Sequence, residues 1–171
     1  MQMTHYMELL ADNQPWNLIL FMAIPVILAE TVAITELFIL FSRRFDGPLA
    51  KLNKIASILG GLYFVGVFIY LMFTAVIPLS QASGWRGPAD TIAVGAYLAG
   101  IVPLLGLALL DLGVTGRHLN TDQRLKQHAI WVAVFLVVAH VAMIFGMLDP
   151  TLLQPSQLTE LNHGHGMSHG M

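Results

Sequence analysis

The chain has 171 residues, of which 56% are hydrophobic and 11% are charged, and it contains no cysteine. Soluble domains carry roughly 25% charged residues, so this composition excludes an ordinary soluble domain and indicates a membrane protein of one domain. A net charge of −2 offers no basic surface for nucleic acid, and the lack of cysteine excludes disulfides and thiolate metal sites.

Four long apolar runs follow one another along the chain, over residues 18–41, 55–79, 91–114 and 129–148. A helix of about 20 apolar residues crosses the hydrocarbon layer of a membrane. The predicted fold is therefore all-α, a polytopic membrane protein with a four-helix transmembrane domain over residues 1–153. A short surface helix is expected over 6–11, and residues 154–171 are expected to form a flexible tail.

Seven of the eight Lys and Arg residues lie in two short loops, 42–54 and 115–128. Positive residues stay on the cytoplasmic side of a membrane, so both loops are predicted to be cytoplasmic and both termini to lie outside. Within the second loop, Asn120 and Gln123 form the pattern of a capped helix start. Asp90 is expected to cap the third span in the same way.

Four ionisable residues fall inside the predicted spans, where a charge costs at least about 2.5–3.5 kcal/mol. At about 1.5 Å rise per residue, Glu30 and His140 both lie about 16 Å from the inner ends of their apolar runs. Glu36 and Asp111 lie only about 5–8 Å from theirs. The sequence therefore predicts two layers, a pair of Glu30 with His140 near the midplane and an acidic mouth of Glu36 with Asp111.

Each layer has a structural and a functional interpretation. Glu30 and His140 form either a buried pair that fixes helix register or a proton relay, cation site or cofactor contact. Tyr63, about 12 Å deep, is placed to add a hydrogen bond to this layer. The inner carboxylates are either functional or neutralised by arginines that reach back from the loops, namely Arg43, Arg44 or Arg117.

The tail carries a second chemical signal, because its last nine residues interleave His and Met with Gly and Ser. Imidazole binds Cu(II), Ni(II) and Zn(II), and thioether favours Cu(I), so the segment suits both oxidation states of copper. Haem is less expected, since no second His matches His140 in depth on another helix. The predicted metal ligands are His163, His165, Met167, His169 and Met171, joined by His5 on the same outer side.

Four segments resemble an uncharacterised family of small four-helix bacterial inner-membrane proteins that are loosely labelled permeases. The resemblance covers about residues 3–153 and implies a membrane location without implying an established activity. The segments are Asn13-Gln-Pro-Trp16, Ala29-Glu-Thr-Val32, Trp85-Arg-Gly-Pro-Ala-Asp90 and Met143-Ile-Phe-Gly-Met-Leu-Asp-Pro150.

The first functional hypothesis is a bacterial inner-membrane protein, not an enzyme, that binds or transports a transition metal, with copper preferred. Two alternatives stay open. One is a membrane anchor or accessory subunit of a respiratory or redox complex that contacts quinone or haem, and the other is a proton-coupled permease for a small solute. The expected partners are the lipid bilayer, the metal ion, and further copies of the chain or a larger membrane complex.

Overall fold

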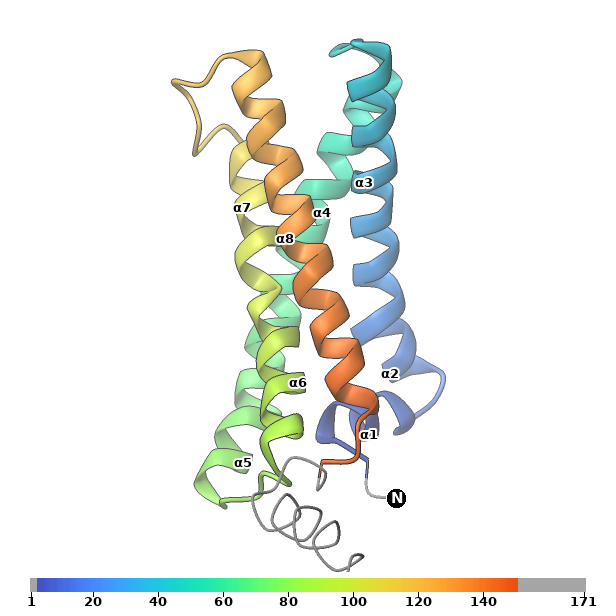
Figure 1. Cartoon of the computed structure of the whole chain (residues 1–171), viewed down its shortest axis with the longest axis vertical. Coiled ribbons are helices and arrows are strands. Elements are labelled where there is room, and N and C mark those ends of the chain that lie inside the picture. The colour runs from blue at the N-terminus through green and yellow to red at the C-terminus, as the bar shows by residue number, and fades with distance from the viewer. Residues whose placement is uncertain (1–2, 151–171) are drawn as a thin grey trace, which may run out of the picture.

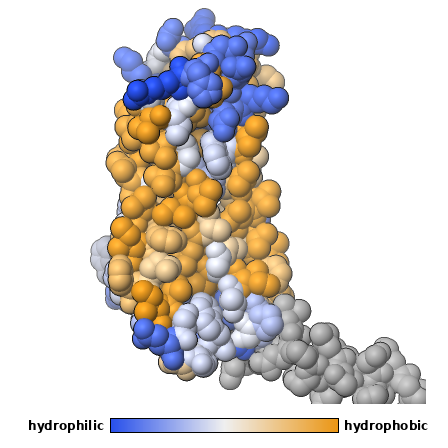
Figure 2. All heavy atoms as spheres, turned by 90° about the vertical axis from the view of Figure 1, so that its left-hand side faces the viewer, coloured by the Kyte–Doolittle hydropathy of each residue, from blue (hydrophilic) through white to orange (hydrophobic). Residues whose placement is uncertain are grey.

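Four antiparallel helices long and apolar enough to cross a membrane make up the computed structural model, which describes residues 3–150 (Figure 1). The spans are Trp16–Ser42, Pro48–Gln81, Pro88–Asp111 and Thr121–Met147. On the face that Figure 2 shows, an apolar belt lies between two more hydrophilic ends. The prediction of an all-α, four-span fold is confirmed, and the chain is a multi-pass membrane protein.

Three of the four spans are interrupted at or near a proline. Pro25 and Pro78 each follow a π-helical turn. The proline ring has no N–H to donate and crowds a carbonyl of the preceding turn, and the wider π turn accommodates both effects. The third span breaks at Gly100, three residues before Pro103. In chain order the elements are α1 (His5–Ala11), α2 (Trp16–Leu18), the π turn Ile19–Ala23, α3 (Ile24–Ser42), α4 (Pro48–Leu71), the π turn Met72–Val76, α5 (Ile77–Gln81), α6 (Pro88–Ala99), α7 (Ile101–Asp111) and α8 (Thr121–Met147).

Two helices begin earlier than the apolar runs at 55 and 129 predicted. α4 begins at Pro48, directly after Gly47, whose φ of 135° ends the preceding loop. α8 begins at Thr121, behind a capping box in which Asn120 and Gln123 each cap the other's backbone N–H, as predicted. The apolar runs mark only the hydrocarbon layer, whereas the first turns of both helices are polar and extend beyond it.

The buried positions of the spans repeat at alternating spacings of four and three residues. This spacing places one stripe of each helix in a common core, as in left-handed bundles, and we call the stripes the seam. The seam positions are 25, 29, 32, 36 and 39 in α3, 53, 57, 60, 64, 67 and 71 in α4, 93, 97, 100, 104, 107 and 111 in α6 and α7, and 128, 132, 135, 139, 142 and 146 in α8.

The helix α1 lies across the end of the bundle where α8 ends (Figure 1). It buries Tyr6 and Leu10 against the spans, and burial raises the pKa of Tyr6 to about 12. Its N-cap residue, Thr4, is fully buried, and the Thr4 hydroxyl donates a hydrogen bond to the Gly146 carbonyl at 2.7 Å. The expected surface helix is therefore packed across the end of the bundle where α8 ends.

Asp90 holds α1 in place and does not cap the third span, whose N-cap position is taken by Gly87. The fully buried Asp90 carboxylate accepts from the backbone N–H of His5 at 2.6 Å and from that of Arg86 at 3.2 Å. The His5 ring also pairs with this carboxylate, at 2.5 Å. The expectation of a cap was wrong because these donors come from outside the helix.

Candidate functional site

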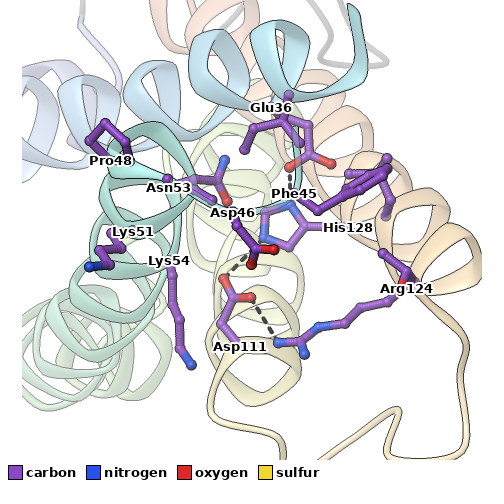
Figure 3. Close-up of a pocket in the computed structure, with 15 residues that line it drawn as sticks. Glu36, Phe45, Asp46, Pro48, Lys51, Asn53, Lys54, Asp111, Arg124 and His128 are labelled. Carbon is purple, nitrogen blue, oxygen red and sulfur yellow. Dashed lines mark hydrogen bonds and ion pairs between the residues drawn. The ribbon is translucent and has the colours of Figure 1, made fainter. Parts of the chain in front are cut away.

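A buried imidazole joins two carboxylates near the end of the bundle that carries the basic loops (Figure 3). His128 of α8 lies between Glu36 of α3 and Asp111 at the end of α7. Its Nδ1 forms an ion pair with Glu36 Oε2, and its Nε2 lies 3.1 Å from Asp111 Oδ2. The three side chains are only 5–9% exposed, so their charges interact without much screening by water.

Asp111 has further partners, and Glu36 does not. The Ser57 hydroxyl donates to Asp111 Oδ2, and the half-exposed Arg124 side chain lies 3.2 Å from Asp111 Oδ1. Glu36 Oε1 is buried and has no hydrogen-bond partner among the described residues. We call these five residues, which come from all four spans, the inner cluster.

The seam explains why these residues meet. Glu36, Ser57, Asp111 and His128 each occupy a seam position of their own span, so all four point into the bundle at one level. Asn53, one seam step before Ser57, donates to the Val32 carbonyl at 3.0 Å and to the Thr35 hydroxyl at 2.9 Å. These polar contacts fix the relative heights of the spans.

Four members of the inner cluster, Glu36, Asp111, Arg124 and His128, line a cavity of about 760 Å³. Asp46, Lys51 and Lys54 line it as well, and both lysine side chains extend away from His128 (Figure 3). Among the Lys and Arg residues of the described chain, Arg124 is the one that pairs with Asp111, and not Arg43, Arg44 or Arg117. Arg117 instead donates to the Gly113 carbonyl at 2.6 Å.

Glu30 and His140 line a second cavity of about 400 Å³, which we call the lateral cavity and which is bounded by α1, the first span, α4, α6 and α8. Both side chains are exposed on the bundle surface, and no hydrogen bond or ion pair joins them within residues 3–150. His140 Nδ1 contacts the Leu136 carbonyl at 2.6 Å, and the Tyr63 hydroxyl donates to the Leu20 carbonyl at 2.8 Å. The structure thus places the expected midplane residues near one cavity without pairing them.

The difference from the depth estimate follows from where α8 begins. Glu36 and His128 are in contact and set the register of α3 against α8. From that contact, Glu30 lies six residues and His140 twelve residues toward the outer side, an offset of about 9 Å. The depth estimate counted residues from the end of each apolar run, at Phe41 and Ala129, and therefore did not show this offset.

Three members of the inner cluster, His128, Ser57 and Arg124, were not predicted from the sequence, and His128 was missed because it precedes the apolar run that begins at residue 129. The signal was present in the spacing. His128 continues the four-three repeat of Val132, Phe135 and Ala142, whereas His140 falls one residue after a seam position. Glu36 and Glu30 differ in the same way on α3.

The predicted metal ligands of the tail, His163, His165, Met167, His169 and Met171, lie outside the described residues. His5 is described, and its Nδ1 is occupied by Asp90. Within residues 3–150, no group of three or more His, Cys, Asp or Glu side chains is arranged to hold a metal ion.

A model of a family of unknown function, DUF6803, matches residues 1–162. The chain belongs to this family. No curated protein and no solved structure matches it. The expected resemblance to an uncharacterised family is confirmed, and the family assigns no role to the inner cluster, so its chemistry has to be argued from its geometry.

Proposed function

We propose that the chain is a proton-coupled permease for a small solute and that the inner cluster is its proton site. The observation that carries the proposal is the His128 imidazole, buried between Glu36 and Asp111 and lining a cavity on the basic-loop side. Histidine is the side chain whose charge ordinarily changes between about pH 5 and 8. Ionisable groups buried in a membrane bundle commonly mark proton relays.

Charge balance supports this role. With both carboxylates ionised, an imidazolium at His128 and the guanidinium of Arg124 bring the inner cluster to zero net charge. Loss of the imidazole proton leaves an uncompensated negative charge in a poorly solvated place, which is unfavourable unless the helices or a solute respond. Because Glu36 and His128 belong to the first and last spans, proton release would weaken the contact between α3 and α8.

The kind of membrane, and the side of it on which the inner cluster lies, are part of the same proposal. The basic loops favour a cytoplasmic position for the inner cavity, and the resemblance noted above supports a bacterial inner membrane. A proton site on the cytoplasmic side is accessible to solutes that enter the cavity past Asp46 and Lys54.

Infrared difference spectroscopy of the purified protein between about pH 5 and 10 tests the proton site without knowledge of the solute. We expect carboxylate and imidazole bands that are lost in Glu36→Gln and in His128→Gln. Asp122→Asn is the matched control, because Asp122 is exposed at the start of α8, outside the inner cluster. Identical difference spectra in the wild type and both cluster variants would refute the proposal.

Copper handling is a second proposal, supported by the His/Met pattern of the tail together with the position of α1. Thr4 contacts Gly146, so the chain leaves α8 beside His5 and the exposed Met3. Ligands from the two ends of the chain would then share the outer surface. Truncation after Leu161 should remove most of the bound copper measured by metal analysis, while the helical content stays unchanged. Equal copper in the full-length and truncated proteins would contradict this proposal.

A further inference from the structure

The lateral cavity has the composition of a small-molecule site and lies among the apolar spans, where α1 covers part of it. Its volume of about 400 Å³ falls in the usual range for ligand pockets, which are mostly apolar with a few polar groups. Its lining follows that rule, with Phe21, Phe64 and Phe135 on its walls and Glu30 and His140 among the few polar side chains.

The cavity is accessible from the hydrocarbon phase. Glu30 is fourteen residues from the outer start of the first span and His140 is seven residues from the outer end of α8, which puts them about 21 Å and 10 Å deep. Both side chains are exposed at those depths, on the lipid-facing surface of α3 and α8. A molecule dissolved in the bilayer reaches them directly.

Glu30 and His140 have polar atoms without hydrogen-bond partners among the described residues, which is unfavourable between apolar helices. Glu30 has no hydrogen-bond partner among the described residues, and a lone carboxylate in hydrocarbon is unfavourable. His140 uses only Nδ1, toward the Leu136 carbonyl at 2.6 Å. The Tyr97 hydroxyl does not serve either group, since it donates to the Phe21 carbonyl at 2.5 Å.

The hydrogen bond of His140 determines what kind of ligand fits. A carbonyl oxygen only accepts, so Nδ1 carries the proton, and Nε2 of the neutral ring is an acceptor. The Glu30 carboxylate is also an acceptor. A ligand that satisfies both must therefore donate two hydrogen bonds. Because Glu30 and His140 are offset by about 9 Å along the bundle, the two hydrogen-bond donors must lie at opposite ends of the polar part of the ligand.

We propose that the lateral cavity binds a quinol-type lipid, a flat ring with hydroxyl groups at opposite ends, between Glu30 and His140. The ring packs against the aromatic walls, and one hydroxyl donates to His140 Nε2 while the other donates to the Glu30 carboxylate. The site is separate from the inner cluster and does not depend on its proton chemistry.

Equilibrium binding of a short-chain benzoquinol and of the corresponding benzoquinone to the detergent-solubilised full chain tests the proposal. The quinone lacks both donors, so its Kd should exceed that of the quinol by at least about tenfold. His140→Leu and Glu30→Gln should each raise the quinol Kd by a similar factor. His118→Leu and Asp122→Asn are the matched controls, because His118 and Asp122 are exposed outside the cavity, and they should leave the quinol Kd unchanged.

A steric variant separates binding in the cavity from partition into the detergent. Val26→Phe adds volume to the cavity wall without removing a polar group, and it should also abolish quinol binding. Equal Kd values for quinol and quinone, or quinol binding that survives both His140→Leu and Val26→Phe, would overturn the proposal. The proposal would also be overturned if the chain did not bind quinol and cross-linking at α3 and α8 showed that a second copy of the chain covers Glu30.

Discussion

Replacing His128 by leucine should destabilise the bundle more than replacing Glu36 by leucine. In His128→Leu, Glu36 loses its ion pair and already has an unpartnered Oε1, so a buried charge is left uncompensated, at a cost of about 3–5 kcal/mol. In Glu36→Leu, His128 keeps Asp111 at 3.1 Å, and we expect a loss of about 1–3 kcal/mol.

The double variant removes both members of the pair and leaves Asp111 with Ser57 and Arg124. Its loss of unfolding free energy should therefore be smaller than the sum of the single losses by about 2 kcal/mol. Unfolding in mixed micelles can be followed by tryptophan fluorescence in a background with Trp16 and Trp85 replaced by Phe, since the remaining Trp131 ring packs against Gly106 across the α7–α8 contact. Additivity within about 0.5 kcal/mol would refute the coupling that the geometry implies.

Three further outcomes follow from other parts of the bundle. A Cβ at Gly61 would lie 2.5 Å from the Ala108 side chain, so Gly61→Ala should cost about 1–3 kcal/mol in detergent unfolding, whereas Gly66→Ala, with open space around it, should be nearly neutral. Asp90→Asn replaces one of two acceptor oxygens by an NH2 donor, which then faces an N–H of His5 or Arg86, and it should release α1; faster proteolysis of the N-terminal segment would reveal this, and unchanged cleavage would contradict it. Reporter fusions at positions 46 and 120 should both read cytoplasmic, and an outside signal at either position would overturn the assigned orientation.

The number of spans was predictable from the sequence because it depends on the length of the apolar runs. Asn120 likewise predicted the start of α8 from local chemistry alone. The inner carboxylates were also found, since any acid inside an apolar run stands out.

The partner of those carboxylates was not found, because depth was measured from the apolar runs. His128 lies in a polar helical turn that hydropathy assigns to a loop, so only its place in the four-three repeat identifies it as a core residue. The packing of α1 across the end of the bundle was not predicted, for a different reason. Contacts such as Thr4 with Gly146 join residues 142 positions apart, and no local pattern specifies them.

That long-range contact has a consequence for membrane insertion. Thr4 and His5 are synthesised ahead of the first span, but their partners are synthesised later, Asp90 with the third span and Gly146 with the fourth. Until then α1 has only its contact with the start of the first span, where Asn17 donates to the Leu9 carbonyl at 3.0 Å. Docking of α1 is thus a step that follows synthesis of α8, and protection of the N-terminal segment from protease would report when all four spans have assembled.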